Sequence, residues 1–462
     1  MTHTRIRAGR SAAPPLRLLL PLAALSCVWL RAVPLTAQTA PSAPPAHAQS
    51  QSALQAADTI LQQMSRITGL PVKGALKKQL ISKPEMKKYL EENLRIEMPP
   101  EEMLGQEAAL KTFGIVGPDF DFEKFLVSFY TEQAAGFYDP RRKTMFMADW
   151  VAPDLQSTVL AHELTHALQD QSFDLWKFMH ATPDDDDATA AREALVEGYA
   201  TLSMTQASLG SVPIEKVPSL DSLMDQLVNQ QMAEFPVFTK APYFLRFQAL
   251  FPYVQGMHFA RRGLKLGGWK RLNETFRHPP ASTAEIFQPD LYFDPPPQAQ
   301  VTKPEQNVLP LPPPPALERS GSLKRVEANV MGEIGYYALI GQLVSQEEAQ
   351  KLSASWRADR YLVYEGPGPS QYTLVARTRW SSPEAAAAFC GDYRALLQKR
   401  WPESTTNAAP AAGAHRAAPG ILPRTSGARR AFLLRRGDEC SWAEGVPEAQ
   451  APELQKWLAA LP

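Results

Sequence analysis

Apolar residues recur every three or four positions through the N-terminal part of the chain, which is the spacing of the buried side of an α-helix. Leu61 and Met64 lie three residues apart, and Leu90 and Leu94 lie four apart. The spacing predicts packing helices from residue 52 to about residue 112.

The pattern changes between residues 125 and 150. Two short apolar segments, ending at Met145, Phe146 and Met147, flank a polar turn that contains Pro140, which predicts a β-hairpin. Helical spacing returns over residues 155–172, 187–210 and 220–276. The acidic run at 184–187 is expected to be a solvated turn and helix N-cap.

Two proline-rich stretches, at 294–297 and 309–315, predict a linker over residues 294–318. Beyond it, helical and strand-like segments alternate. The sequence therefore predicts an α+β protein, with a mostly helical domain over 52–293 and a smaller α+β domain over 319–462. The expected C-terminal helices cover 328–343, 347–356, 383–397 and 452–461, and the expected strands cover 361–364, 372–378 and 431–435.

Composition and charge narrow the class of protein. Hydrophobic residues make up 44% of the 462 residues, which is enough for a folded core. Lys and Arg together number 48, as do Asp and Glu. This balance argues against a partner that is a nucleic acid or an anionic membrane surface.

The first residues predict export. Arg5, Arg7, Arg10 and Arg17 precede an apolar run over 18–30, followed by small residues and prolines. This is typical of a signal peptide, here residues 1–37, with cleavage as late as residue 48 as an alternative. We expect a periplasmic or extracellular protein without a stable membrane span after cleavage. A retained anchor and a lipoprotein attached at Cys27 are the alternatives.

Two cysteines, Cys390 and Cys440, remain after removal of the signal peptide. In an oxidising compartment they are expected either to form a disulfide or to stay as two buried thiols.

The segment His162-Glu163-Leu164-Thr165-His166 carries the candidate chemistry. Histidines four apart on a helix project from one face, so both imidazoles can reach one ion, and the glutamate between them can lie beside it. Catalytic zinc usually has three protein ligands and a water. A third ligand is expected downstream, where Glu193 and Glu197 lie one turn apart on a second helix.

These residues resemble the gluzincin metallopeptidases, in which a glutamate directly before a glycine completes the zinc site. The resemblance implies Glu197 as the ligand, because Gly198 follows it, and Glu193 as a supporting or surface residue. Residues 161–171 are also similar to a phrase in uncharacterised exported bacterial peptidase-MA-like proteins, and the similarity extends over about 52–293. That group often has an acid where this chain has Tyr199.

The resemblance implies a zinc-dependent peptidase in which Glu163 is the general base. Met145 to Met147 are expected either to form an edge strand that pairs with an extended peptide or to belong to a packing hairpin. Tyr253 and Tyr199 are candidate donors to the oxyanion.

The expected function is therefore an exported zinc metallopeptidase that acts on a peptide or protein, with His162, His166 and Glu197 as metal ligands. One alternative is a non-catalytic periplasmic binding or assembly module with a structural zinc. Another is a zinc hydrolase of a non-peptide amide or ester. The oligomeric state is left open.

Overall fold

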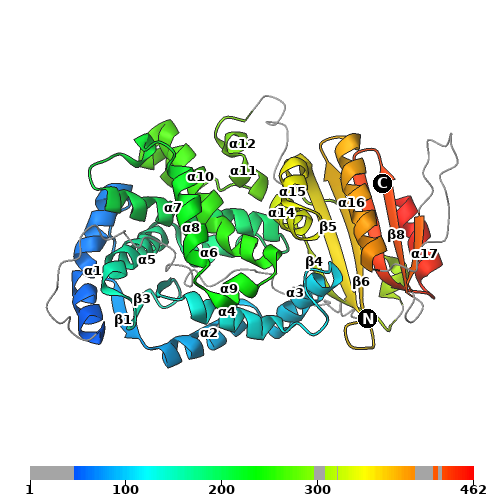
Figure 1. Cartoon of the computed structure of the whole chain (residues 1–462), viewed down its shortest axis with the longest axis horizontal. Coiled ribbons are helices and arrows are strands. Elements are labelled where there is room, and N and C mark those ends of the chain that lie inside the picture. The colour runs from blue at the N-terminus through cyan, green and yellow to red at the C-terminus, as the bar shows by residue number, and fades with distance from the viewer. Residues whose placement is uncertain (1–45, 296–306, 320, 401–419, 425–428, 462) are drawn as a thin grey trace, which may run out of the picture.

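The computed structural model describes residues 46–295, 307–319, 321–400, 420–424 and 429–461. The predicted signal peptide, 1–37, and Cys27 lie outside them. The chain is mixed α+β, as predicted, with a mainly helical N-terminal part and a C-terminal part built on a larger sheet (Figure 1). Within the described residues, no helix has the length and apolar character needed to cross a bilayer.

The N-terminal part contains the predicted hairpin and long helices over the segments 155–172, 187–210 and 220–276. Its elements are α1 (Ala46–Thr68), β1 (Lys77–Ile81), α2 (Lys83–Glu97), α3 (Pro100–Thr112), α4 (Phe122–Gln133), β2 (Gly136–Asp139), β3 (Thr144–Ala148), α5 (Pro153–Phe173), α6 (Leu175–Met179), α7 (Asp186–Leu209), α8 (Leu220–Met232), α9 (Pro236–Lys240), α10 (Tyr243–Glu274), α11 (Thr283–Phe287) and α12 (Pro289–Phe293).

Strand β1 corrects two expectations. Residues 52–112 are not helical throughout, because β1 pairs in parallel with β3, with Lys77 opposite Thr144. The sheet order is β1-β3-β2, so β3 is the central strand. The expectation that Met145 to Met147 form an edge strand for a peptide is therefore wrong, since both sides of β3 are already paired. Strand β2 lies at the edge next to α5.

The acidic run is only partly as predicted. The Asp185 side chain accepts a hydrogen bond from the Ala188 backbone N–H and so caps α7. Asp187, however, is buried and not solvated. Its carboxylate accepts hydrogen bonds from the backbone and hydroxyl of Thr283, which ties the start of α7 to the start of α11.

The C-terminal part forms an antiparallel sheet in the order β4-β5-β6-β9-β8-β7. Strands β4, β7 and β9 were not predicted, and the expected helix at 328 begins only at Gly332. The elements are α13 (Pro315–Glu318), β4 (Lys324–Asn329), α14 (Gly332–Leu343), α15 (Gln346–Leu352), β5 (Trp356–Glu365), β6 (Tyr372–Trp380), α16 (Pro383–Arg400), β7 (Gly420–Arg424), β8 (Arg429–Arg436), β9 (Glu439–Pro447) and α17 (Ala451–Ala460).

Side chains that alternate along each strand pack into different apolar clusters on the two faces of this sheet. On β5, Val363 joins the apolar cluster of α14 and α16, whereas Leu362 joins the cluster of α17, because successive residues of a strand point to opposite faces. Leu311 and Leu317, from the second half of the proline-rich segment, pack on the α17 side. Cys390 of α16 and Cys440 of β9 form a disulfide, with Cα atoms 6.0 Å apart.

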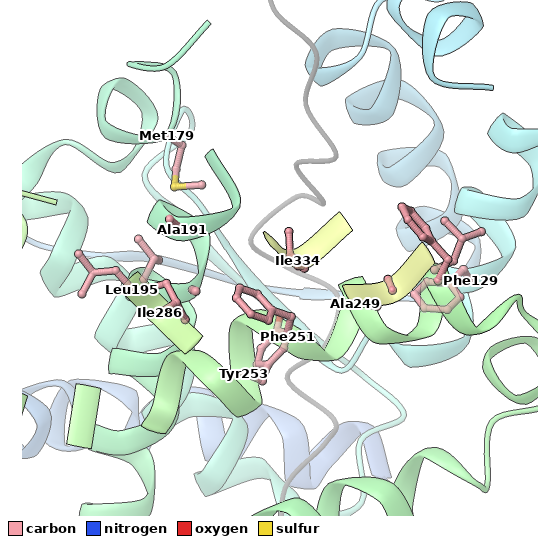
Figure 2. Packing of buried hydrophobic residues seen from close by; sticks show 14 of the residues in the cluster. Phe129, Met179, Ala191, Leu195, Ala249, Phe251, Tyr253, Ile286 and Ile334 are labelled. Atoms are coloured by element: carbon pink, nitrogen blue, oxygen red, sulfur yellow. The ribbon is translucent and has the colours of Figure 1, made fainter. Parts of the chain in front are cut away.

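One continuous apolar core joins the two parts of the chain. Ile334 of α14 and Phe251 of α10 belong to the same cluster of buried side chains (Figure 2). This cluster runs from α1 and the hairpin through α7 and α10 to one face of the C-terminal sheet. Apolar burial therefore holds the C-terminal part against the N-terminal helices.

Helices α7 and α10 cross at a pair of glycines. A Cβ atom on Gly198 would lie less than 3.0 Å from the backbone of Gly256, and a Cβ atom on Gly256 would lie as close to the backbone of Ala194. Real Cβ atoms do not approach backbone this closely. The two helices can keep their separation only with glycine at both positions.

The glycine crossing gives a first prediction. Gly198→Ala should lower the free energy of unfolding by about 3 kcal/mol, because the added methyl group must push two helices apart. Gly391→Ala is the matched control, since Gly391 is an exposed helical glycine with open space around it. That change should stabilise by about 0.5–1 kcal/mol. Urea denaturation measures the free energy of unfolding of both variants. Equal stability of Gly198→Ala and the unchanged protein would contradict the close backbone contact between α7 and α10.

Buried carboxyl groups gather where α7, α11 and α14 begin. Burial, and then the neighbouring Asp187, raises the pKa of Glu333 to about 9. Burial, and then Asp185, raises the pKa of Asp187 to about 8, while Arg357 partly opposes the shift of Glu333. A carboxyl group with a raised pKa binds its proton more tightly in the folded chain than in the unfolded one.

The second prediction follows from this sign. An unfolded glutamate releases its proton near pH 4, whereas folded Glu333 keeps it until about pH 9. Its contribution to stability is therefore fully present below pH 4 and is lost as the pH rises towards 9. Since each pKa unit corresponds to about 1.4 kcal/mol, Glu333→Gln should be more stable than the unchanged protein by several kcal/mol at pH 9 and by less than about 1 kcal/mol at pH 5.

Urea denaturation at pH 5, 7 and 9 measures this difference. Glu101→Gln, at an exposed position in the first turn of α3, is the control and should leave the pH dependence unchanged. If Glu333→Gln loses stability between pH 5 and pH 9 as steeply as the unchanged protein does, then Glu333 is ionised in the folded chain.

Candidate metal centre

Helix α5 carries the two histidines through the middle of the N-terminal part. It begins with Pro153 in its first turn and ends at Asp174, which has a left-handed backbone conformation. Leu160, Leu164 and Leu168 are fully buried on the sides of the helix. Every residue from 159 to 170 is buried, so this stretch of α5 also buries the polar residues that it carries.

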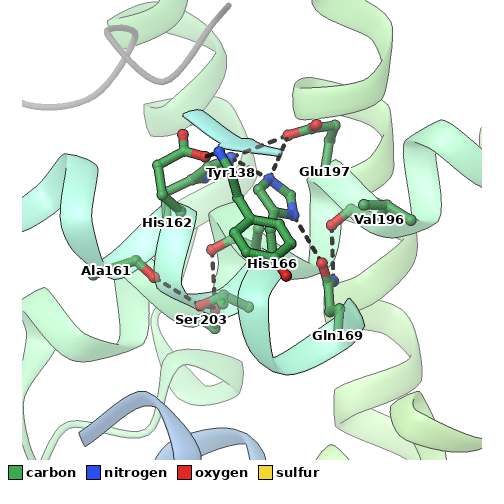
Figure 3. A network of polar contacts seen from close by, with 11 residues as sticks. Tyr138, Ala161, His162, His166, Gln169, Val196, Glu197 and Ser203 are labelled. Carbon is green, nitrogen blue, oxygen red and sulfur yellow. Dashed lines mark hydrogen bonds and ion pairs between the residues drawn. The ribbon is translucent and has the colours of Figure 1, made fainter. Parts of the chain in front are cut away.

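Three side chains from α5 and α7 converge on one point (Figure 3). His162 Nε2 lies 3.0 Å from His166 Nε2 and 3.1 Å from Glu197 Oε2, and the third separation is 3.4 Å. A tetrahedral metal ion with bonds of about 2.1 Å separates its ligand atoms by about 3.4 Å. The structure thus brings the three expected ligands together at a spacing that a metal ion could occupy.

Gln169 orients one of the histidines. Its side-chain nitrogen donates to the Val196 carbonyl at 3.1 Å, so its oxygen faces His166 Nδ1 at 2.8 Å. His166 Nδ1 is therefore protonated, and Nε2 is the nitrogen that faces the centre and would present its lone pair to a metal ion. His162 Nδ1 is buried and has no hydrogen-bond partner among the described residues.

Without a metal the same atoms form a buried ion pair. Burial alone would raise the pKa of Glu197, but the two histidines lower it to about 2. Burial alone would lower the pKa of His166, but Glu197, followed by Glu163, raises it to about 9. A metal ion at this point would replace a proton as the positive charge that the carboxylates share.

Glu163 lies beside the three converging side chains but is not one of them. Its Oε2 accepts a hydrogen bond of 2.9 Å from the Tyr138 backbone N–H of β2. The Tyr138 hydroxyl donates to Asp170 at 2.7 Å, and Lys143 pairs with the same carboxylate. Helix α5 therefore holds the hairpin at two points, and the side chain of Glu163 is fully buried.

The two candidate tyrosines occupy different places. Tyr253 of α10 stacks on the His162 ring, with centroids 6.2 Å apart. Burial, and then Glu197 and other carboxylates, raises its pKa, so its hydroxyl stays protonated and able to donate. Tyr199 instead donates to Asn273 at 2.7 Å and packs on Trp269. The expectation that Tyr199 supplies an oxyanion donor is therefore wrong.

Sequence reasoning missed the roles of Gln169 and of the Tyr138 backbone. Gln169 follows His166 by three residues on one helix, a spacing at which side chains meet, so this signal was present in the sequence. The hydrogen bond between the Tyr138 N–H and Glu163 joins residues 25 positions apart, so the pattern of residue types along the chain does not indicate it. Glu193 is buried and so is not a surface residue.

Comparison with known proteins places part of the chain in a described domain. Residues 319–455 match the family model of a domain of unknown function, DUF8575. This match runs from before β4 into α17 and contains none of the residues of the candidate metal centre. No curated protein and no solved structure matches the chain.

Proposed function

We propose that the protein is an exported zinc-dependent metallopeptidase. The observation that carries the proposal is the position of Glu163. Its buried carboxylate lies next to the three converging ligand atoms but is not one of the ligands. Glu163 also holds β2 through the Tyr138 N–H, but that task does not require a proton acceptor beside the zinc, whereas the activation of a water does. The resemblance of residues 161–171 to exported peptidase-MA-like proteins adds the peptide bond as substrate.

His162, His166 and Glu197 would hold the zinc, which when bound lowers the pKa of a water and polarises a carbonyl. Glu163 accepts the proton of the attacking water and delivers it to the departing amine. Tyr253 donates a hydrogen bond to the carbonyl oxygen as negative charge develops there. Gln169 keeps the His166 ring in its orientation during these steps.

The disulfide supports the proposed location. Bonds such as Cys390–Cys440 persist in the periplasm and outside the cell but are rare in a reducing cytoplasm. This agrees with the signal peptide that the first 37 residues predict.

The burial of the centre favours a second candidate function. His162, Glu163, His166 and Glu197 each have an exposed fraction of 1% or less, as in a metal site that only holds a fold together. In that case the protein is a non-catalytic binding or assembly module, and substitution of a ligand costs stability without costing activity.

The third prediction separates the two functions. Glu163→Gln should keep about one zinc per chain and lower kcat/KM on unfolded casein by at least about 100-fold, because glutamine still accepts the Tyr138 N–H but cannot take a proton. His166→Ala should lose both zinc and activity. His278→Ala, at an exposed histidine outside the centre, should lose neither. Elemental analysis and a casein assay measure the two quantities.

Two outcomes of these measurements would contradict different parts of the proposal. Zinc in both the unchanged protein and Glu163→Gln, with no cleavage by either, would overturn the peptidase and support a structural zinc or a non-peptide substrate. Absence of zinc from the unchanged protein after incubation with zinc would overturn the metal site itself.

The fourth prediction concerns Gln169. Gln169→Ala should raise the zinc dissociation constant by about 10–100-fold, because His166 loses the partner that fixes its ring. Gln171→Ala is the control, since Gln171 on the same helix contacts the Lys73 backbone and not the centre. Competition with a chromophoric chelator measures both, and equal affinities would show that Gln169 does not orient a ligand.

A further inference from the structure

A cavity lies between the N-terminal helices and the region that matches DUF8575. Its volume is about 70 Å³, several times what one water molecule needs. Helices α3, α7 and α10 form one side. The DUF8575 region, residues 319–455, forms the other with Val330, Met331, Ile334 and Tyr361. Neither part of the chain encloses this space alone.

The cavity and the candidate metal centre share one face of α7. Asp186, Ala190 and Glu193 line the cavity, and Glu197 follows at the same helical spacing of three or four residues. The cavity therefore ends about one turn from the metal ligand. Pro252 also lines it, and the next residue, Tyr253, stacks on His162.

The walls combine apolar surface with polar atoms that lack partners. Gln106 is 2% exposed, and neither atom of its side-chain amide has a hydrogen-bond partner among the described residues. The same holds for Gln248 Oε1 and Asp186 Oδ1. Each such buried atom costs about 1–3 kcal/mol. A ligand with hydrogen-bond donors would satisfy the three oxygen atoms, whereas Gln106 Nε2 is itself a donor and needs an acceptor.

The charges that line the cavity are all of one sign. Asp186 and Glu193 are its ionisable carboxyl groups, and no lysine, arginine or histidine of the described chain lines it. Burial is the main cause that raises the pKa of both groups, followed by Glu327 for Asp186 and Glu197 for Glu193. A cation bound beside them would favour the ionised form of these carboxyl groups and so oppose the effect of burial.

The distance along α7 suits a long side chain. Asp186 and Glu193 are seven residues apart, which corresponds to about 10 Å of helix. A lysine or arginine side chain that enters from the metal side can lay its apolar stem against Ile334 and Tyr361. Its charged end then reaches Asp186 and Gln106.

We propose that this cavity is the specificity pocket of the peptidase and binds a lysine or arginine side chain of the substrate, with the DUF8575 region as one wall. That the bound side chain belongs to a substrate rests on the proposed function. The binding of a basic side chain, however, can be measured without any cleavage.

The first test uses two small probes on one protein. Titration calorimetry on the zinc-loaded Glu163→Gln protein compares Nα-acetyl-lysine amide with Nα-acetyl-norleucine amide, which lacks only the ammonium group. The lysine probe should bind at least about 10-fold more tightly. Equal binding of the two probes, or no binding of either, would overturn the proposal without requiring any further variant.

The second test places the binding in this cavity. Asp186→Asn should remove most of the preference for the lysine probe, and Ile334→Trp should block both probes by filling the wall that the DUF8575 region supplies. Asp184→Asn is the matched control, because Asp184 belongs to the same acidic run but is exposed. A preference that survives Asp186→Asn in a folded protein would place the binding elsewhere and overturn the proposal.

Cleavage sites in casein, mapped by mass spectrometry on the unchanged protein, distinguish the two levels of failure. Cleavage with no enrichment of lysine or arginine beside the cut bond would overturn the pocket and leave the peptidase. Selective binding of the lysine probe without any cleavage would leave the pocket and overturn the peptidase.

Discussion

The close crossing of α7 and α10 is the constraint on which the rest of the centre depends. Backbone meets backbone at Gly198, so the residue before it, Glu197, is placed by main-chain contact and not by the packing of its own side chain. Two hydrogen bonds then tie α7 to α5. Thr165 contacts Ser203 at 3.0 Å, and Gln169 contacts the Val196 carbonyl at 3.1 Å. The histidines have little freedom to move away from the carboxylate.

The helices and the histidine pair could be predicted because their signals are local, whereas Glu197 on a second helix was chosen over Glu193 only through the resemblance to the gluzincins. The repeat of apolar residues and the His162-to-His166 spacing depend on one helix at a time. Strand β1 could not be predicted, since its segment, Lys77 to Ile81, has weak alternation and is a strand only because β3 lies beside it. Strand β4 has the same difficulty: few of its residues are apolar, and its pairing partner is more than twenty residues away.

Glu163 has two tasks that compete for one carboxylate. It holds the edge of β2 through the Tyr138 N–H, and in the proposed chemistry it also takes up a proton. The backbone contact fixes the position of the carboxylate, which favours reaction at a defined point. It also occupies an outward-facing N–H of β2 that an extended peptide would otherwise use. Substrate recognition by side chains fits this arrangement better than recognition by strand pairing.

The continuous core affects the order in which the protein can fold during synthesis. The ribosome delivers α7 and α10 well before α14, so the apolar face of α10 that Ile334 later covers has no partner when it first emerges. Partly made chains therefore expose a surface that attracts other unfolded chains. A chaperone that holds the nascent chain until the last third has been made would protect this surface.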